Sequence, residues 1–393
     1  MNAPSDSSGP LAGVTVVELA GLGPVLHGVT LLADLGAAVV RVDRPGAVAA
    51  EHPEGSPREP LGRGRRSIAL DLKAAEGREL LERLLGDADV LVDPYRPGVL
   101  ERLGLDPERL IEANPRLVVA RMTGWGQSGP LAAAAGHDLN YLARTGALQL
   151  IGEEDRPPPV PLNLIGDFGG GGMLLAFGVA AALFERERSG RGQVIDVAMI
   201  DGIASLMTSI FQLDARAKWK PGRHTNWLQG AAPWYSAYET ADGRFVTVAT
   251  LEPQFYAALL GALGLDPEEW PQWDEAAWPR LRERLAATFR TATMVAWEER
   301  LAAVDCCFAP VLWPTEAAAD EHLAERGVYQ EIDGVLQPGA VPRFSRSAAA
   351  PAPPAPWPGA DTRAVLADLG VDGARLAELA GRGVLAGAKT GEG

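Results

Sequence analysis

The first 125 residues alternate short apolar runs with longer amphipathic segments. Runs typical of buried strands cover residues 14–19, 38–43, 67–72, 88–93 and 117–122. Helical spacing of leucines marks the segments that end at Gly36 and Leu85, and Asp106-Pro107 has the composition of a helix start. This repeated strand–helix–strand order predicts a doubly wound α/β sheet with right-handed crossovers.

A second region continues the α/β pattern with an unusual glycine cluster. An apolar run at 160–165 leads to Asp167 and four glycines, Gly169 to Gly172, before a helical pattern that reaches about Arg188. We expect Asp167 to open this helix. A strand at 192–197 and a helix at 200–214 follow.

The pattern changes after residue 229 and predicts a smaller α+β domain. Apolar alternation at 234–239 and 245–250 around Asp242-Gly243 is typical of a β-hairpin, and the following segments predict helices at 253–263, 277–290, 295–304 and 316–326, with a strand at 307–312. We assign residues 1–214 to a large domain, 215–228 to a linker and 229–345 to the small domain. Residues 346–393, which begin with a Pro/Ala-rich linker, complete the large domain, and residues 1–10 are expected to be disordered.

Composition narrows the classes of function. A chain of 393 residues is long for one core, which agrees with two domains. The formal net charge of −15 argues against nucleic acid as the main partner. The two cysteines, Cys306 and Cys307, have no metal-ligand or disulfide spacing. We find no signal peptide and no apolar run long enough to span a membrane, so we expect a cytoplasmic protein without a membrane partner.

Several nucleotide and metal motifs are absent. Gly21-x-Gly23 follows a strand, but a dinucleotide fingerprint needs a third glycine at position 26, where the chain has Leu26. Gly169 to Gly172 is not followed by Gly-Lys-Ser/Thr, which a phosphate-binding P-loop requires. Without His-Glu-x-x-His or Cys-x-x-Cys, we expect neither a metal nor a redox cofactor.

Three titratable residues remain as candidates for catalysis. His137, in the polar stretch Gly136-His-Asp-Leu-Asn-Tyr141, and Asp167 are bases of different charge type that could remove and return a proton at one carbon. Each has an alternative interpretation: His137 as a structural histidine, Asp167 as a helix cap, and Glu252 as a first-turn carboxylate that complements a helix dipole. A basic cluster, Arg58, Arg63, Arg65 and Arg66, is either a solvated loop or a site for a phosphorylated ligand.

Together these stretches resemble the α-methylacyl-CoA racemases of the family III CoA-transferase (CaiB/BaiF) superfamily. The resemblance is collinear from about Leu11 to Ala360 and rests on these stretches: Val-Val-Glu-Leu-Ala-Gly-Leu-Gly-Pro, Arg-Val-Asp-Arg-Pro-Gly, Gly-His-Asp-Leu-Asn-Tyr, Pro-Leu-Asn-Leu-Ile-Gly-Asp-Phe-Gly-Gly-Gly and Leu-Glu-Pro-Gln-Phe-Tyr. It implies a Rossmann-like large domain, a small domain and an interlocked homodimer. In such a dimer the active site forms between the large domain of one chain and the small domain of the other.

The resemblance also implies roles for individual residues. His137 and Asp167 would be the two bases in racemisation of a 2-methyl-branched acyl-CoA in lipid metabolism, and Glu252 would orient and charge His137. Main-chain N–H groups at the start of the Asp167 helix would hold the enolate oxygen. CoA contacts are expected from Arg41, Arg66, Leu70, Lys73, Arg96, Gly136, Asp138 and Tyr141.

The sequence departs from the family at two places that should lie near the acyl pocket. Val25 and Leu26 replace a Gly-Pro pair, and Trp227, Gln229 and Ala231 stand in a stretch that is usually Asn-Met-Leu-Asp-Gly-Gly-Ala-Pro; Trp234 adds bulk nearby. Two alternatives therefore remain. One is a CoA-transferase with Asp167 as nucleophile. The other is a specialised or non-catalytic acyl-CoA protein.

Overall fold

A computed structural model describes residues 8–49 and 55–387, which form two compact units. One unit comprises the chain up to Ala147, Pro161–Met207 and the chain from Gly327 on; the other comprises Leu148–Val160 and Thr208–Arg326. The sequence placed the boundaries at residues 214 and 345, whereas contacts change in the structure at 207 and 327. Most of the amino-terminal stretch predicted to be disordered, residues 1–7, lies outside the described residues.

The large unit is built on a seven-stranded sheet in the order β12-β3-β2-β1-β4-β5-β6. Six strands are parallel, and β12 joins the β3 edge in antiparallel orientation. The strands are β1 Thr15–Leu19, β2 Ala38–Asp43, β3 Arg65–Leu70, β4 Val90–Asp93, β5 Val118–Thr123, β6 Val194–Ala198 and β12 Leu385–Ala386. The expected α/β class with a large parallel sheet is confirmed; β12 had not been predicted.

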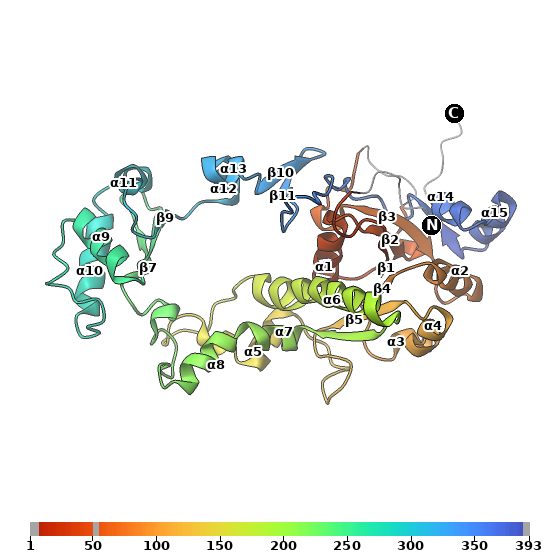
Figure 1. Cartoon of the computed structure of the whole chain (residues 1–393), viewed down its shortest axis with the longest axis horizontal. Helices are drawn as coiled ribbons and strands as arrows, with labels where there is room; N and C mark the ends of the chain where they lie inside the picture. Colours follow the sequence, from red (N-terminus) through yellow and green to blue (C-terminus); the bar gives the residue numbers. More distant parts are fainter. Residues whose placement is uncertain (1–7, 50–54, 388–393) are drawn as a thin grey trace. The chain divides into compact units, whose positions relative to one another are not determined.

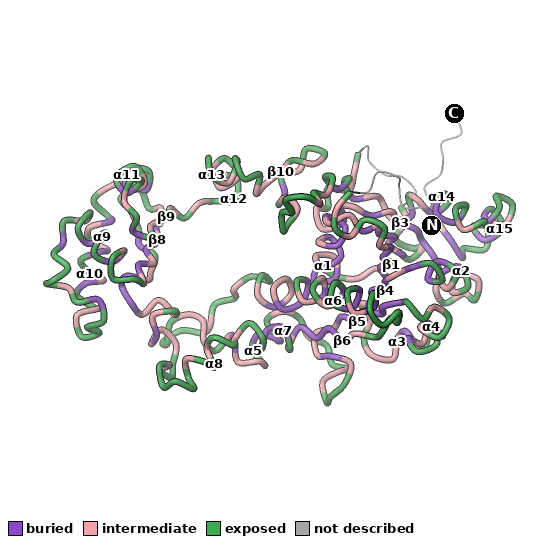
Figure 2. Tube along the Cα trace, in the orientation of Figure 1, coloured by how far each residue is buried: buried purple, intermediate pink, exposed green. Residues whose placement is uncertain are grey.

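Helices cover both faces of this sheet (Figure 1). Leucines of α2 Ala75–Gly86, α4 Pro107–Ala113, α14 Thr362–Asp368 and α15 Gly373–Gly381 share one core with β1, β2 and β3. On the other face, α1 Gly23–Asp34 packs against α6 Met173–Ser189, which also contacts β5 and β6. The short α3 Val99–Arg102 and the predicted cap of α4 are present: Asp106 Oδ1 accepts the Glu108 N–H at 2.9 Å. Figure 2 shows the central strands in the colour of buried residues.

Two arginines of the basic cluster, Arg63 and Arg65, are buried and form ion pairs in the interior. Arg65 forms an ion pair with Glu18 at 2.6 Å, with both side chains 0% exposed. Arg63 pairs with Asp34 at 2.6 Å and donates to Gln337 Oε1 at 3.0 Å. Buried pairs of this kind are costly to break, because the remaining partner keeps an uncompensated charge. These two arginines are therefore structural and unavailable to a phosphorylated ligand.

The helix that carries Asp167 begins earlier than expected. A π-helical stretch, η4 Leu164–Gly172, runs directly into α6, so Asp167 is the fourth residue of the helix and not its start. A Cβ at Gly170 would lie 3.0 Å from Ile203, and one at Gly172 would lie 2.5 Å from His27 Nδ1. The glycines thus allow η4 to pack closely on α1 and α7.

The continuous helical stretch of η4 and α6 is unusually apolar. By length and composition, one described stretch, Leu164–Ser189, could cross a membrane; 39% of its most apolar window is buried. This is weak evidence, because core helices pass the same test, and α6 packs on the sheet. The helix predicted at 200–214 is broken at Met207 into α7 Met199–Leu206 and α8 Thr208–Ala215.

The second unit has its own core around a three-stranded sheet. The sheet is antiparallel, with β7 Tyr235–Glu239, β8 Phe245–Ala249 and β9 Phe308–Pro310, and it carries α9 Pro253–Ala262, α10 Trp278–Phe289 and α11 Met294–Leu301. Trp234 and Phe289 are fully buried in this core. The helix predicted at 316–326 is interrupted at Asp320, giving α12 Pro314–Ala319 and α13 Glu321–Glu325. The hairpin of β10 Tyr329–Ile332 and β11 Val335–Pro338, which belongs to the large unit, had not been predicted.

Candidate active site

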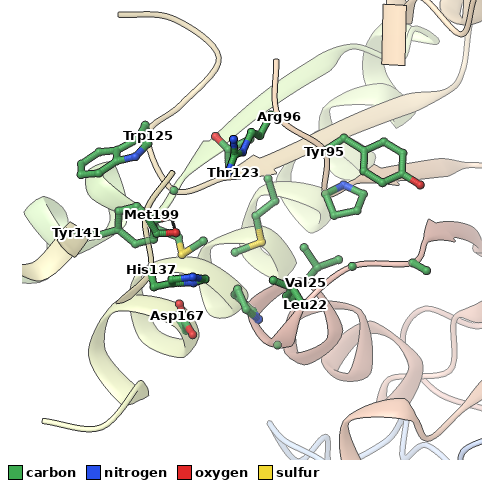
Figure 3. A pocket seen from close by; sticks show the side chains of 18 of the residues that line it. Leu22, Val25, Tyr95, Arg96, Thr123, Trp125, His137, Tyr141, Asp167 and Met199 are labelled. Atoms are coloured by element: carbon green, nitrogen blue, oxygen red, sulfur yellow. Dashed lines mark hydrogen bonds between the residues drawn. The ribbon is translucent and has the colours of Figure 1, made fainter. Parts of the chain in front are cut away.

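A cavity of about 600 Å³ opens at the carboxyl ends of β1 and β4 in the large unit. The strand order reverses between these neighbours, and open α/β sheets bind ligands at such a switch point. Gly21 allows the loop after β1 to approach the loop after β4, because a Cβ there would lie 2.6 Å from Pro94. The cavity is lined, among others, by Leu22, Val25, Arg41, Arg44, Tyr95, Arg96, Met122, Trp125, His137, Tyr141, Asp167 and Met199 (Figure 3).

His137 enters this cavity from the amino terminus of α5 Asp138–Thr145. It is the N-cap residue, and its main-chain N–H donates to Asn140 Oδ1 at 3.1 Å. Tyr141 supports the preceding turn, with its hydroxyl donating to Gly136 O at 2.5 Å. A Cβ at Gly136 would lie 2.8 Å from the Tyr141 ring, so glycine is required where the turn crosses the ring. The local sequence therefore fixes the backbone of His137 while its ring stays accessible.

Asp167 enters the cavity from η4 and is half-buried. Its main-chain N–H donates to Asp138 Oδ1 at 2.8 Å. Burial raises the pKa of the Asp167 carboxyl and the negative charge of Asp138 raises it further, whereas a hydrogen bond with Asn163 and the charge of His137 act in the opposite direction. The net shift is upward, which favours a protonated carboxyl over a larger pH range than in water.

The structure thus brings the two predicted bases to one cavity. In Figure 3 the His137 ring and the Asp167 carboxyl lie next to each other at the cavity wall. They come from different helices, α5 and η4, so their separation is set by packing of those helices and not by sequence spacing. An imidazole and a carboxylic acid placed in this way can exchange protons with one bound carbon acid.

The residues expected to contact CoA fall into two groups. Arg41, Arg96, Gly136 and Tyr141 line the cavity, together with His137 and Asp167. Arg66, Lys73 and Leu70 do not line it: Arg66 pairs with Asp368 at 3.3 Å, and Lys73 is exposed near the start of α2. Leu70 is 1% exposed in the sheet core. Its side chain therefore packs in the core and does not contact a ligand, contrary to the prediction. Asp138 does not line the cavity either, and its Oδ1 accepts the Asp167 main-chain N–H.

Several cavity residues were not identified from the sequence. Arg44 directly follows β2, Tyr95 follows β4, and Trp125 follows β5. Their shared position just beyond the carboxyl ends of predicted parallel strands is the signal that could have found them. Trp125 packs edge-on against Tyr141, with ring centroids 4.8 Å apart.

Glu252 belongs to the second unit and is the N-cap residue of α9. Its carboxylate lies near Cys307, and burial followed by the charges of Asp305 and Glu252 raises the pKa of that thiol. The helix-terminal position agrees with the structural interpretation of Glu252 as well as with a catalytic one. Its predicted interaction with His137 stays a prediction.

Two of the substitutions expected to reshape the acyl pocket have structural roles instead. Trp234 is 0% exposed and donates to Gln272 O at 2.8 Å in the core of the second unit, so it cannot line a pocket. Gln229 closes its own loop: its Oε1 accepts from Asn226 N at 3.0 Å, and its Nε2 donates to Leu150 O at 3.0 Å. Trp227 packs edge-on against Tyr235, with ring centroids 5.2 Å apart.

Within residues 8–49 and 55–387, no group of three or more His, Cys, Asp or Glu side chains is arranged to hold a metal ion.

Comparison with known proteins places the chain in a family. The model of CoA-transferase family III matches residues 11–362. The chain belongs to CoA-transferase family III. It is 45% identical to the α-methylacyl-CoA racemase of Mus musculus over 87% of this chain and 88% of the relative, and 42% identical to that of Homo sapiens over 92% and 93%. A CaiB/BaiF family protein from Brucella suis has a similar crystal structure, with a TM-score of 0.79, 28% identity, and coverage of 92% of this chain and all of that one.

Proposed function

We propose that this family III protein is a racemase or epimerase that acts on the α-carbon of a 2-methyl-branched acyl-CoA thioester. The observation that carries the proposal is the presence of His137 and Asp167, from two separate helices, at the wall of one cavity. The raised pKa of Asp167 supports it, because one partner must arrive protonated. The names of the mouse and human relatives, both α-methylacyl-CoA racemases, point to the same reaction.

The proposed reaction moves one proton across one carbon. Neutral His137 removes the α-proton from one face, leaving an enolate, and the protonated Asp167 carboxyl returns a proton to the opposite face. The enzyme then holds imidazolium and carboxylate, which is the form that accepts the other stereoisomer. The pair therefore carries one shared proton in both directions, and no metal or redox cofactor takes part in these steps.

The enolate oxygen needs fixed hydrogen-bond donors. The sequence led us to expect them at the start of an Asp167 helix, but Asp167 lies inside η4 and its N–H is already bound to Asp138. The first turn of α5, which begins at the cavity beside His137, is the alternative that we propose. The Asn140 N–H already donates to His137 O at 2.8 Å, so the donors would be the N–H groups of Asp138 and Leu139, at the positive end of the helix dipole.

The cavity also offers residues suited to each of the two parts of an acyl-CoA. Arg41, Arg44 and Arg96 line the cavity and would pair with phosphate groups of CoA. Val25, Met122 and Met199 also line it and would contact the branched acyl group. Contacts from Arg66 and Lys73 to more distant parts of CoA stay a prediction.

Our proposal includes a homodimer in which Glu252 of the partner subunit pairs with His137. An exposed apolar stripe on α6 supports an additional protein contact: Met173 is 51% exposed, Phe177 71% and Phe184 68%. Their spacing of four and seven residues places them on one helix face. A stripe of this kind on a soluble protein is typical of an interface.

The alternative, a CoA-transferase with Asp167 as nucleophile, is less well supported. Transferases of the superfamily tend to carry a mobile, glycine-rich loop over the site. Here the corresponding segment, Gly230 to Pro233, is held by hydrogen bonds from Arg282. The Arg282 Nη2 donates to Gly230 O at 2.7 Å and to Ala231 O at 2.8 Å. Trapping an Asp167 adduct with hydroxylamine or borohydride would favour the transferase over the racemase.

The proposal is tested by isotope exchange in deuterated water. The protein should introduce deuterium at the α-carbon of a 2-methylacyl-CoA and convert either stereoisomer into a mixture of both. A second assay measures CoA transfer: a straight-chain acyl-CoA is mixed with a free carboxylate acceptor, and formation of the acceptor's CoA thioester is followed. Absence of α-exchange with every 2-methylacyl-CoA tested would overturn the proposal.

A further inference from the structure

Asp138 connects the two proposed bases. It follows His137 directly in the sequence, and its Oδ1 accepts the Asp167 main-chain N–H at 2.8 Å. The contact is tight, because a Cβ at Gly166 would lie 2.3 Å from the same oxygen. Glycine at position 166 is therefore what allows the Asp138 carboxylate to reach the backbone of η4.

This hydrogen bond holds the Asp138 carboxylate at the backbone of Asp167, where its charge acts on the Asp167 carboxyl. An amide oxygen at position 138 could also accept this N–H, but only a carboxylate adds a negative charge next to Asp167 and strengthens the hydrogen bond by that charge. Two neighbouring carboxyl groups resist double ionisation, so one of them tends to keep its proton. We propose that Asp138 is a positioning residue, which fixes η4 at Asp167 and keeps the Asp167 carboxyl in its proton-donating form.

The surroundings of Asp167 identify Asp138 as the charge that acts in this direction. After burial, Asp138 is the largest cause of the raised pKa of Asp167, and His137 opposes it. Tyr141, also on α5, has a pKa raised by its own burial and then by the charge of Asp167, with Arg96 opposing.

The other helices packed on η4 add few titratable groups. From α1, His27 stacks on Phe168 with ring centroids 4.7 Å apart; its pKa is lowered by burial and by Arg63, which favours the neutral ring. From α7, Met199 and Ile203 meet the glycines. The Asn163 side chain hydrogen-bonds with Asp167 and lowers its pKa.

The inference rests on the proposed function, and the proton balance defines its kinetic consequence. The active pair holds one proton, and the acid limb of the rate profile reports addition of a second. Without the charge of Asp138, the Asp167 pKa falls and less of the pair is present as neutral His137 with protonated Asp167. Because the equilibrium between stereoisomers is unchanged, kcat/KM must change equally in both directions.

The test isolates Asp167 as the only base. In a His137→Ala background, α-deuterium exchange of the one reactive stereoisomer requires ionised Asp167, so its pH midpoint reports the Asp167 pKa. Adding Asp138→Asn, which keeps an oxygen acceptor for the N–H, should move this midpoint to lower pH. In the otherwise native protein, Asp138→Asn should lower kcat near neutrality by about tenfold and move the acid limb to lower pH. An unmoved midpoint overturns the inference.

A matched control and a second measurement separate this inference from the proposed function. Asp196 Oδ2 accepts the main-chain N–H of Gln127 at 2.9 Å, so Asp196→Asn makes the same change elsewhere and should leave the midpoint in place. Titration of the ¹³C carboxyl signal of Asp167, assigned with Asp167→Asn, measures the same pKa without turnover. If the native protein shows no exchange, the proposed function fails, while the ¹³C midpoint still decides the role of Asp138.

Discussion

The main-chain N–H of Asp167 lies 2.8 Å from Oδ1 of Asp138, the residue that follows His137. Two stretches separated by almost thirty residues are thus joined by a direct bond between their central motifs. The bond sets the position of η4 against α5, and with it the distance between the two proposed bases. A mechanism that needs both bases at one carbon depends on this contact.

Single substitutions of the two bases should separate the two faces of the substrate. His137→Ala and Asp167→Asn should each reduce racemisation by roughly 10²- to 10⁴-fold, because each removes one of two required proton-transfer groups. Each variant should still exchange the α-proton of the stereoisomer that its surviving base can reach. Deuterium incorporation into each pure stereoisomer measures this preference. Exchange of the same stereoisomer by both variants would contradict the two-base assignment.

Glu252→Gln should resemble His137→Ala in kind and be milder. The substitution keeps the shape of the side chain but removes the charge that would stabilise the imidazolium, so kcat should fall while some racemisation remains. Rates for both stereoisomers, measured with Glu268→Gln as a surface control in the same unit, check the effect. An unchanged kcat would indicate that Glu252 has no role in the reaction beyond its position at the start of α9.

The alternation of apolar runs was sufficient to predict the large parallel sheet and most of its helices. It succeeded because buried parallel strands are apolar on both faces and short, whereas the covering helices show a leucine stripe. Two short elements were missed because they lack such a pattern: β12 contains only Leu385–Ala386, and the β10–β11 hairpin lies in a segment of mixed polarity. Neither carries a periodic signal.

Site prediction depended on what kind of information each residue carries. His137 and Asp167 stand in distinctive motifs, so the family resemblance identified them. We expected Asp167 to open its helix, but the helix begins at Leu164, and the glycines after Asp167 accommodate close packing of η4 on α1 and α7. The positions of Gln229 and Trp234 depend on tertiary hydrogen bonds that no local pattern encodes.

Arg96 should contribute to binding more than to chemistry. It is exposed at the cavity beside Tyr95, where an anionic group of CoA would find it. Arg96→Ala should raise KM for an acyl-CoA by about tenfold with a small change in kcat, since a phosphate contact is made equally in ground and transition states. Steady-state kinetics at low and high salt, with Arg375→Ala on α15 as control, test this. A fall in kcat at constant KM would contradict a phosphate-binding role.

Gln229 should affect stability and not substrate choice. Gln229→Leu removes the acceptor for Asn226 N and the donor to Leu150 O and leaves these polar groups without their partner. Each lost partner costs roughly 1–3 kcal/mol when the group stays desolvated, so the melting temperature should fall by several degrees. Thermal unfolding and a panel of acyl-CoA substrates measure both properties. A changed acyl preference at an unchanged melting temperature would indicate instead that Gln229 shapes the acyl pocket.

Asp93 should make stability depend on pH between about pH 4 and 7. Burial raises its pKa from 3.8 to about 6, against the opposing effects of the Tyr95 N–H and Arg121. Below the unfolded pKa, both states hold the proton and nothing is lost. As pH rises past it, the unfolded state ionises first, so the folded state loses about 3 kcal/mol, from two pKa units of 1.36 kcal/mol each, and the loss is complete above the folded pKa.

Asp93→Asn removes this loss and tests it directly. Arg121 keeps its second partner, Glu101, at 2.7 Å, so the variant does not leave the guanidinium without an acceptor. The free energy of unfolding of Asp93→Asn minus that of the native protein should therefore increase by about 2 kcal/mol between pH 4 and pH 7, because part of the total loss has already occurred at pH 4. Urea unfolding at several pH values measures it, with Asp196→Asn as the exposed control. A difference that is constant with pH, or that decreases as pH rises, would show that Asp93 is not held with a raised pKa in the folded protein.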